Sequence, residues 1–352
     1  MTKERVAVAL SGGVDSAVAA YLLQKKGYEV IGMHMILQIP REASLQGAHS
    51  EGIQQIQRFC DDLGIGFYAV DLCSEFKKKV VDSFIEDYKA GLTPNPCIRC
   101  NYYIKFGSLL RRAAELKAGH MATGHYARLS LADGAYRIMR GKDMLKDQSY
   151  MLCRLSQQQL AHALFPLGEY TKEEVIRIAL HEGFAAAHRR SSQDICFIRG
   201  RYNAFLYRHL GPVPGNIRDK YGNILGSHAG IYNFTIGQRY GTGLAAGKRL
   251  YVTQIDSGSN TITVGDMEDI YHHALIAVDV NWVAGVPPAS GGGIKAQIRY
   301  KSAAAEAVLK LEQDHIHVQF STPQKAITPG QSIAFYSDDE LLGGGMIQSY
   351  AQ

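Results

Sequence analysis

Short apolar runs alternate with amphipathic stretches through the first half of the chain. The apolar runs have the length of buried strands and lie at residues 5–10, 28–35, 67–71 and 120–124. The amphipathic stretches have helical spacing and lie at residues 16–27, 51–64, 74–91 and 102–119. Strands that alternate with helices predict an α/β fold, with a parallel sheet covered by helices on both faces. A further helix is expected at 171–183, where Thr171 and Glu174 have the spacing of a capping box.

The pattern changes beyond about residue 205, where helical periodicity ends. Short β-type runs punctuated by Gly, Asn and Pro follow at residues 222–247, 250–266, 294–300, 306–320 and 331–337. The Gly- and Pro-rich segment 284–293 has the composition of a linker. We therefore expect an α/β domain at 1–205, a central β-rich domain at 206–272 and a C-terminal antiparallel β-barrel at 273–352.

Composition narrows the class of protein. A chain of 352 residues is longer than one hydrophobic core usually serves, and 46% apolar residues is ordinary for a globular protein. The first apolar run, Val6 to Leu10, is too short for a signal peptide or a membrane span, so a cytoplasmic protein is expected. Six unevenly spaced cysteines do not predict a disulfide scaffold. The net charge of +5 permits a polyanionic partner without demonstrating one.

The stretch "SGGVDS", Ser11 to Ser16, lies between a predicted strand and a predicted helix. Glycines let the backbone turn tightly, and the exposed amides at a helix start favour phosphate. The loop lacks the Gly-Lys-[Ser/Thr] of a Walker A motif. Asp15 would repel phosphate unless it helps to hold a divalent ion such as Mg²⁺. An ordinary tight turn between strand and helix is the alternative.

A close pair of thiols, Cys97 and Cys100, lies in "TPNPCIRCNYYIKFG", and Cys196 lies 96 residues beyond Cys100. Sulfur transfer needs two thiols, one to carry a persulfide and one to release its sulfur and leave a disulfide. Arg99, Lys105 and a helix starting at Asn101 are expected to lower the thiol pKa values.

Metal sites are the alternatives at these thiols. A zinc site would combine Cys97 and Cys100 with His120 or His125. An iron–sulfur cluster would use Cys97, Cys100 and Cys196 and leave one iron open. Cys60, Cys73 and Cys153 fall on apolar faces and are expected to be packing residues.

Several motifs together resemble known families. "SGGVDS" resembles the fingerprint of the PP-loop ATP pyrophosphatases, whose sheet is of the adenine nucleotide alpha hydrolase type. "TPNPCIRCNYYIKFG", "ATGHYAR", "KDQSYML", "SSQDICFI" and "FTIGQRYGTGL" follow in the order typical of bacterial tRNA-specific 2-thiouridylases. The resemblance extends to "TPGQSIAFYSDDELLGGGMI" near the end of the chain. It implies a PP-loop domain, a small central β domain and a C-terminal barrel.

The resemblance also implies roles for single residues. Cys100 would be the catalytic thiol and Cys196 the persulfide carrier, while Asn95, Pro96 and Cys97 would meet the target base. The implied ATP contacts are Ala9, Leu10, Ser11, Gly12, Gly13, Val14, Asp15, Ser16, Met35 and Gly124. The implied tRNA contacts are His125, Lys146, Asp147, Gln148, Arg299, Tyr300 and Gln331. Met35 has a second interpretation as plain strand core.

Two departures from the family pattern are visible. Some members have Asp where this chain has Cys97, which strengthens the iron–sulfur alternative. The family's usual "TG[IV]CFIG" is "SQDICFIRG" here, so the loop around Cys196 differs.

The implied reaction uses ATP and Mg²⁺ to adenylate the C2 oxygen of the wobble uridine, U34. Sulfur from the Cys196 persulfide then replaces AMP, giving 2-thiouridine, AMP and pyrophosphate. Partners would be the anticodon region of tRNA and a sulfur donor of the cysteine desulfurase or sulfur-relay type, with no membrane. Basic stretches that suit RNA lie at 111–112, 188–190, 199–202 and 299–301. The rival functions are an iron–sulfur-dependent tRNA thiolase, a PP-loop synthetase of a small molecule, and a non-catalytic RNA-binding protein.

Overall fold

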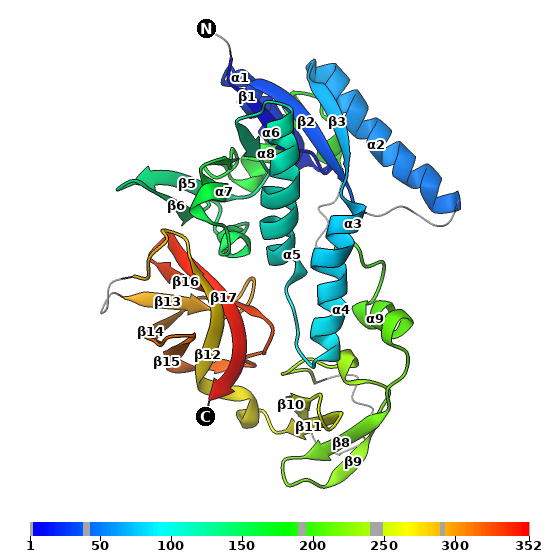
Figure 1. The fold of residues 1–352 in the computed structure, drawn as a ribbon, viewed down its shortest axis with the longest axis vertical. Coiled ribbons are helices and arrows are strands. Elements are labelled where there is room, and N and C mark those ends of the chain that lie inside the picture. The colour runs from blue at the N-terminus through cyan, green and yellow to red at the C-terminus, as the bar shows by residue number, and fades with distance from the viewer. Residues whose placement is uncertain (1–2, 38–42, 189–194, 240–248, 289–292, 352) are drawn as a thin grey trace.

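The computed structural model describes residues 3–37, 43–188, 195–239, 249–288 and 293–351, which form three sheets with flanking helices (Figure 1). An elongated molecule results, with a helix-covered parallel sheet at one end and β structure at the other (Figure 1). Within these residues no helix is both long and apolar enough to cross a membrane.

The N-terminal sheet is parallel throughout, and its strand order is β3-β2-β1-β4-β7. Its strands are β1 (Arg5–Ala9), β2 (Glu29–Ile36), β3 (Gly66–Asp71), β4 (His120–Ala122) and β7 (Ala163–Leu164). Strand β1 is buried on both faces: Val6 and Val8 pack into the core on one face of the sheet, and Ala7 packs into the core on the other. This alternation is the two-residue period of a strand, and it confirms the predicted α/β fold.

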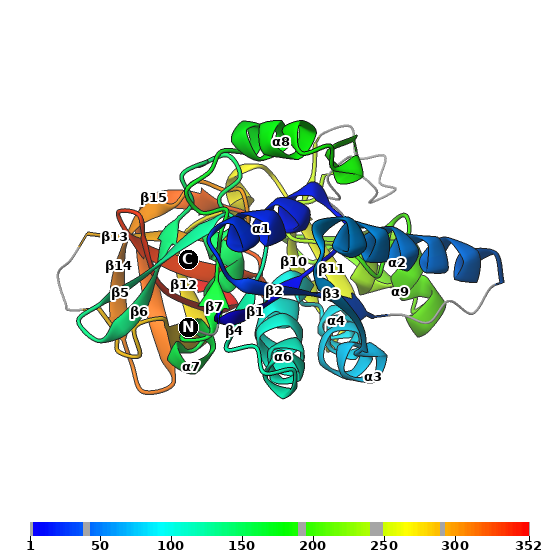
Figure 2. The same cartoon turned by 90° about the horizontal axis from the view of Figure 1, so that it is seen from above.

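Helices cover both faces of this sheet (Figure 2). The helices α1 (Val14–Lys25), α2 (Ala43–Leu63) and α8 (Lys172–His181) supply Val18, Ile56 and Val175 to the core that holds Val6 and Val8. The opposite core receives side chains from α3 (Cys73–Phe76), α4 (Asp82–Lys89) and α6 (Leu110–Glu115), and from the π-helical segments η1 (Lys77–Val81) and η2 (Cys100–Leu109). The capping box predicted at Thr171 and Glu174 is confirmed at the start of α8.

The helix expected at 102–119 begins earlier, and the expected cysteine turn is itself helical. Helix α5 (Pro96–Arg99) runs directly into η2 and then α6. The Asn95 side chain accepts hydrogen bonds from the Cys97 and Ile98 amides, and Pro96 occupies the first helical position. A proline there loses no hydrogen bond and has the right φ. The prediction of a helix start at Asn101 is therefore wrong, and both thiols lie in the first turns of a helix.

A small mixed sheet follows helix α9 (Tyr202–Leu210), so helical structure continues a few residues beyond the expected 205. Its strand order is β10-β11-β8-β9. The strands are β8 (Gly215–Asp219), β9 (Ile224–His228), β10 (Tyr251–Asp256) and β11 (Thr261–Gly265). Ile217, Val252, Ile262 and Val264 make its core. Residues 240–244 of the "FTIGQRYGTGL" motif lie outside the described part of the chain.

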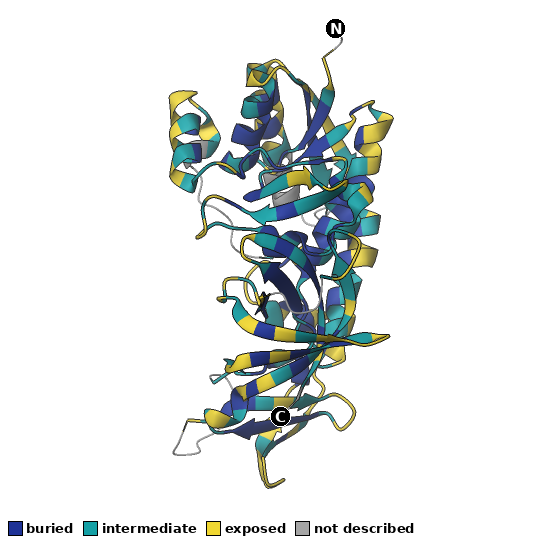
Figure 3. Ribbon diagram, turned by 90° about the vertical axis from the view of Figure 1, so that its left-hand side faces the viewer, coloured by how far each residue is buried: buried dark blue, intermediate teal, exposed yellow. Residues whose placement is uncertain are grey.

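The C-terminal strands close into an antiparallel barrel, as expected. The order β12-β15-β14-β13-β16-β17 is closed by pairing of β12 with β17. The strands are β12 (Tyr271–Trp282), β13 (Ile294–Gln297), β14 (Ala305–Leu311), β15 (His315–Lys325), β16 (Ser332–Ser337) and β17 (Glu340–Ala351). From His315 to Phe320 of β15, buried residues alternate with partly or fully exposed ones. Figure 3 shows bands of buried and exposed residues along the strands at this end of the molecule. The segment 284–293, expected as a linker, connects β12 to β13 within the barrel sheet; of it, 289–292 are not described.

A hairpin that the sequence pattern did not reveal joins the first domain to the barrel. It consists of β5 (Ala127–Ala132) and β6 (Ala135–Arg140) and directly follows β4. Met139 and Ile138 of β6 pair with Glu340 and Leu341 of β17. The short remaining elements are η3 (Ser149–Leu152), α7 (Gln157–Leu160), η4 (Ala185–His188), η5 (Ile231–Asn233) and η6 (Glu268–Ile270).

Candidate active site

The Ser11–Ser16 loop lies at the carboxyl end of β1, where the strand order reverses between β2 and β4. Such a reversal opens a crevice at the edge of a doubly wound sheet, where ligands bind. The Ser16 hydroxyl donates to the Gly13 carbonyl at 2.9 Å and accepts from the Ser11 amide at 3.2 Å. Gly12 has a φ of 80°, a conformation that favours glycine. These contacts fix the loop in a turned shape at the start of α1.

Two residues that sequence reasoning missed hold Asp15. The Tyr126 hydroxyl donates to Asp15 Oδ1 at 2.8 Å, and the Lys172 ammonium lies 2.6 Å from the same oxygen. Lys172 is the first residue of α8, so its side chain brings positive charge to the loop from 157 residues away in sequence. The only sequence signal was that Tyr126 falls inside "ATGHYAR". The lysine offsets the acidic charge that makes Asp15 unfavourable beside phosphate.

Two further predicted nucleotide contacts lie at neighbouring strand ends. A Cβ atom on Gly124 would lie 2.9 Å from the Asp15 carbonyl carbon and 3.0 Å from the Ser16 amide nitrogen. Only glycine therefore fits where the end of β4 meets the loop. Met35, near the end of β2, is partly buried and packs against the core beside β1.

The fold brings the three candidate thiols into one neighbourhood. Cys97 and Cys196 reach the surface and Cys100 is 9% exposed, and all three are free thiols. The charge of Cys196 acts on Cys100, and the charge of Cys97 acts on both. Cys196 is therefore close to the start of η2 despite its distance in sequence. Asp194 and the rest of 189–194 lie outside the described residues.

The expected lowering of the thiol pKa values is wrong for this structure. Burial raises the pKa of Cys100 from 9.0 to about 12, and the positive charge of Lys105 opposes that shift without cancelling it. Although Cys97 and Cys196 reach the surface, the protein atoms around their thiols partly desolvate them and raise their pKa values, again against the charge of Lys105. Arg99 is not among the charges that act on these three thiols. Its guanidinium donates to the Ser83 hydroxyl at 2.6 Å and to the Lys79 carbonyl at 3.3 Å.

Lys105 is the cation common to this neighbourhood. Because Cys100–Leu109 is π-helical, Lys105 follows Cys100 by one i→i+5 turn. Its charge acts on Cys97, Cys100 and Cys196 and also on His125. A long π-helical segment is rare and often marks a functional site. Here it sets an ammonium group within range of all three thiols.

The barrel braces the segment that leads to the cysteines. Gln331 donates to the Thr93 carbonyl at 2.7 Å, and the Thr93 amide donates to the Pro329 carbonyl at 2.9 Å. Gly330 has a φ of 88°, and a Cβ atom there would lie 2.7 Å from Leu92 Cβ. Gln331 was expected to contact tRNA, but in the structure its side-chain amide donates this hydrogen bond to the protein backbone.

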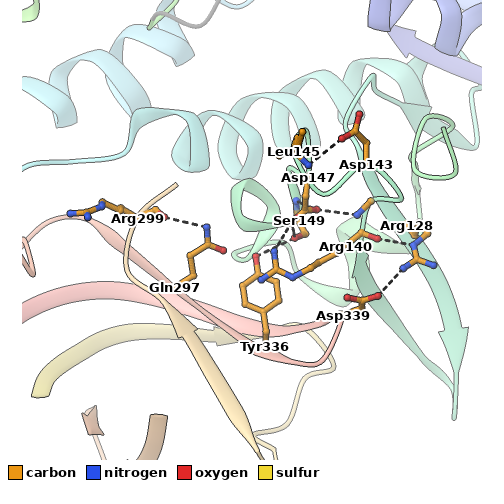
Figure 4. Close-up of polar contacts among 11 residues, drawn as sticks. Arg128, Arg140, Asp143, Leu145, Asp147, Ser149, Gln297, Arg299, Tyr336 and Asp339 are labelled. Atoms are coloured by element: carbon orange, nitrogen blue, oxygen red, sulfur yellow. Dashed lines mark hydrogen bonds and ion pairs between the residues drawn. The ribbon is translucent and has the colours of Figure 1, made fainter. Parts of the chain in front are cut away.

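Asp147, the middle residue of the predicted "KDQ" contacts, belongs to a second brace, drawn in Figure 4. The Asp147 carboxylate is 6% exposed and pairs with Arg140 at 2.9 Å. It also accepts from the Gly141 amide, the Ser149 amide and the Ser149 hydroxyl. The Ser149 hydroxyl meets the Tyr336 hydroxyl of the barrel at 3.1 Å, and Arg140 lies 3.8 Å from the centre of the Tyr336 ring. Both carboxylate oxygens of Asp147 therefore have partners within the protein.

The other predicted RNA contacts differ in accessibility. Gln148 accepts from the Tyr126 amide at 3.1 Å, and Lys146 is partly exposed on the same loop. His125 is 8% exposed, shares a 2.7 Å hydrogen bond with the Thr123 hydroxyl, and has a pKa lowered well below 6.5 by burial. Arg299 is exposed. Burial raises the pKa of Tyr300, and the negative charges of Asp147 and then Cys97 raise it further, so Tyr300 lies near Cys97.

The donor sets for metals can be tested against this geometry. Within the described part of the chain, the set of three metal-ligating atoms that lie within 4.8 Å of one another is Glu312, His315 and His317, not the cysteines. His120 Nδ1 lies 2.6 Å from a carboxylate oxygen of Glu4, and His125 Nδ1 shares a hydrogen bond with the Thr123 hydroxyl. The donors proposed for zinc are therefore not assembled at Cys97 and Cys100. Nothing in the arrangement of the thiols adds support to the iron–sulfur alternative.

Comparisons with known proteins cover almost the whole chain. Residues 4–200 match a family model described as a tRNA methyl transferase HUP domain, 203–266 a tRNA methyl transferase PRC-barrel domain, and 272–347 an aminomethyltransferase β-barrel domain. A protein of Clostridium perfringens named tRNA-specific 2-thiouridylase MnmA is 42% identical over 99% of both chains. A protein of Caldanaerobacter subterraneus named tRNA-specific 2-thiouridylase MnmA 1 is 45% identical over 98% of both chains.

One solved structure has a lower similarity to this chain. A 4-thiouridine synthetase in complex with RNA and ATP is 16% identical, with a TM-score of 0.33, over 55% of this chain and 45% of that chain. A likeness of this size does not bear on function.

Proposed function

The chain belongs to the tRNA-specific 2-thiouridylase family, and on that premise we propose how its residues divide the work of an ATP-using tRNA-uridine 2-sulfurtransferase. The enzyme replaces the C2 oxygen of a tRNA uridine with sulfur. We assign the wobble uridine as its target, the Ser11–Ser16 loop to ATP, and Cys100 and Cys196 to sulfur.

The observation that carries the assignment is the proximity of Cys196 to Cys100, close enough for a charge on Cys196 to raise the pKa of Cys100. Their charges interact although 96 residues separate them in sequence. Two thiols in reach of one another are what a persulfide relay requires. Both belong to the same domain as the loop that suits a nucleotide phosphate.

Activation of the uridine falls to the loop and its neighbours. The C2 oxygen attacks the α-phosphorus of ATP, and pyrophosphate leaves. Amides of the loop, the start of α1 and the Lys172 ammonium meet the phosphate charge in this assignment, which is electrostatic stabilisation of a charged transition state. Mg²⁺ bound with ATP would neutralise further charge, and Asp15 is the carboxylate suited to hold it.

Sulfur transfer then uses the two thiols in sequence. The terminal sulfur of a Cys196 persulfide attacks C2, and the bond from C2 to the oxygen of AMP breaks. The Cys100 thiolate next attacks the Cys196 sulfur, which breaks the S–S bond and leaves sulfur on C2. A Cys100–Cys196 disulfide remains, and an external thiol reduces it. Lys105 favours the thiolate form of Cys100 at this step.

The base and the RNA are held around the same helix start. We propose that Asn95, Pro96 and Cys97 meet the flipped uracil, since they form the start of α5 just before Cys100, where Cys97 is exposed and Asn95 partly exposed. Lys146 and Tyr300, which are partly exposed, and Arg299, which is exposed, are assigned as RNA contacts. A cysteine desulfurase or a relay protein is the proposed source of the persulfide sulfur.

The test is a thiolation assay with ATP, Mg²⁺, unmodified tRNA, cysteine and a cysteine desulfurase, read by nucleoside mass spectrometry. Cys100→Ser and Cys196→Ser should each abolish 2-thiouridine, whereas Cys73→Ser, a thiol outside the neighbourhood, should not. Full activity of Cys196→Ser would overturn the relay. Visible absorbance after anaerobic purification, lost in Cys97→Ser, would favour the iron–sulfur alternative instead. Hydrolysis of ATP to AMP and pyrophosphate with a small molecule, in the absence of tRNA, would favour the synthetase alternative.

A further inference from the structure

A second cluster of chemically active side chains lies on the barrel, away from the thiols. It is carried by the hairpin of β14 and β15 and consists of Glu312, His315 and His317. The Glu312 amide donates to the His315 carbonyl at 3.0 Å, which makes Gln313 and Asp314 a two-residue turn. The two strands then pair in register, with Leu311 opposite Ile316 and Lys310 opposite His317.

The strand period turns both histidines outward. Ile316 and Val318 are 5% and 0% exposed and belong to the barrel core, so the residues that alternate with them face the other way. The exposed fractions of the His315 and His317 side chains are 31% and 43%. Both imidazoles are therefore open to solvent on one face of the barrel wall.

The three side chains converge on one point. His315 Nε2 and His317 Nε2 are 3.1 Å apart. Glu312 Oε2 lies 3.6 Å from His315 Nε2, and Glu312 Oε1 lies 3.8 Å from His317 Nε2. In a tetrahedral zinc site with Zn–N of about 2.0 Å, neighbouring ligand atoms are about 3.3 Å apart. The two nitrogens are already close to that spacing, and the carboxylate needs a shift of only a few tenths of an ångström.

We propose that Glu312, His315 and His317 bind a divalent late transition-metal ion of the zinc class. Two imidazole nitrogens and one carboxylate are a donor set that such ions prefer over Mg²⁺ or Ca²⁺. Without a metal, the facing Nε2 atoms of His315 and His317 can share one hydrogen bond, in which one nitrogen donates and the other accepts. A bound cation would instead accept the lone pairs of both nitrogens. Three protein ligands on an exposed hairpin leave the fourth position to water, so the ion exchanges with solvent.

Lys310 sets the strength of this site. Its ammonium lies 2.9 Å from Glu312 Oε1, on the strand position opposite His317. The lysine occupies one carboxylate oxygen and leaves Oε2, the oxygen nearer to His315, for the ion. Because ammonium and metal ion compete for the same carboxylate, the lysine weakens metal binding without preventing it.

The experiment titrates Co²⁺ and Zn²⁺ into the full-length chain carrying Cys97→Ser, Cys100→Ser and Cys196→Ser, so that the thiols do not contribute. One equivalent should bind, with the visible absorption of tetrahedral Co²⁺ and displacement by Zn²⁺. His315→Ala or His317→Ala removes a direct ligand and should lower the affinity by more than the roughly tenfold to hundredfold that the loss of an outer-shell partner costs. Lys310→Gln should raise it. His273→Ala, which removes an exposed histidine elsewhere on the barrel, is the matched control and should leave it unchanged.

Three results would overturn the site. The first is that no stoichiometric metal binding occurs, and the second is that the His315 and His317 variants bind the metal as tightly as the parent. The third is that His273→Ala loses as much affinity as those two variants. Each variant is first compared with the parent by circular dichroism. The substituted side chains are solvent-accessible, so the fold is expected to persist.

Discussion

At the scale of single residues, the site is a balance between burial and one positive charge. Burial stabilises the neutral thiol of Cys100, while Lys105, one π-turn along, favours the thiolate. Asp15 shows the opposite balance, because its negative charge in the Ser11–Ser16 loop is compensated by Lys172 at 2.6 Å. In both places a lysine brings positive charge to the site: Lys105 acts on Cys100, and Lys172 pairs with Asp15.

The first prediction concerns the pH dependence of Cys100. Because its pKa is raised to about 12, the thiol is protonated at neutral pH and its alkylation by iodoacetamide should rise about tenfold per pH unit from 7 to 9, without a plateau. Lys105→Met should lower the rate at every pH, whereas Lys78→Met, on an exposed part of η1, should not. The rate is measured by peptide mass spectrometry, since cleavage after Arg99 separates Cys97 from Cys100. A plateau near pH 7 would contradict the raised pKa.

The same raised pKa has a consequence for stability. The unfolded thiol ionises near 9 and the folded one near 12, so protons are lost first from the unfolded chain. The contribution of Cys100 to stability is therefore complete below about pH 9 and declines as the pH rises toward 12.

A second prediction concerns Lys172. Lys172→Met leaves Asp15 uncompensated beside the phosphates and should slow pyrophosphate release roughly tenfold to a thousandfold. Lys142→Met is the matched control, because Lys142 pairs at 3.1 Å with Glu174 on the same helix start, in a more exposed position. Release of pyrophosphate with tRNA present is the measurement. Equal rates in the two variants would argue against a role for Lys172 at the nucleotide.

At the scale of elements, the decisive feature is the helix that starts at Pro96. Its cap, Asn95, fixes the first turn, which carries Cys97 and leads into Cys100. The continuation as a π-helix changes the spacing from i+4 to i+5, which aligns Lys105 with Cys100. The cap and the wide helix together position the thiols, so the two prolines of "TPNPC" serve the helix start.

A prediction separates capping by Asn95 from recognition of the base. Asn95→Ala should lower the free energy of unfolding by about 0.5–2 kcal/mol, because the Cys97 and Ile98 amides lose their acceptor. Asn95→Asp keeps the acceptor and should retain the stability. Denaturant unfolding gives the stability and the thiolation assay gives the activity. If Asp and Ala destabilise the protein equally, the side chain is not acting as a cap.

At the scale of the whole molecule, the barrel serves as a brace for the catalytic domain. Gln331 and Pro329 hold the segment before the cysteines, and Tyr336 closes the Arg140–Asp147 network. The β5–β6 hairpin extends the barrel sheet into the first domain, and α9 crosses the boundary that we propose at 205/206. The three proposed domains are therefore expected to unfold together rather than as separate units.

A prediction at this scale concerns Asp147. Asp147→Ala leaves Arg140, whose side chain is 14% exposed, without its carboxylate, and should lower the free energy of unfolding by about 3–5 kcal/mol. Asp339→Ala breaks the 3.5 Å pair with Arg128 at an exposed position and should cost less than about 1 kcal/mol. Thermal and denaturant unfolding measure both. Wild-type stability with weakened tRNA binding would instead make Asp147 an RNA contact.

The sequence by itself determined whatever depends on neighbours along the chain. Residue periodicity was enough for the parallel sheet, the strand-rich second half and the barrel, because strands and helices bury faces at fixed spacing. The capping box at Thr171 and the glycine loop at Ser11–Ser16 are local in the same sense. Their residues lie within one turn of each other, so the pattern of residue types alone predicts the conformation.

Tertiary structure alone decided what depends on distance through space. Three such relations join residues that are 96 to 238 positions apart: the proximity of Cys196 to Cys100, the ion pair of Lys172 with Asp15, and the hydrogen bond from Gln331 to the Thr93 carbonyl. The raised thiol pKa values reversed the expectation from nearby cations, because desolvation reflects how many protein atoms surround a group, and a linear pattern does not contain that number. Local geometry is encoded by adjacent residues, whereas burial and electrostatics arise only once the chain has packed.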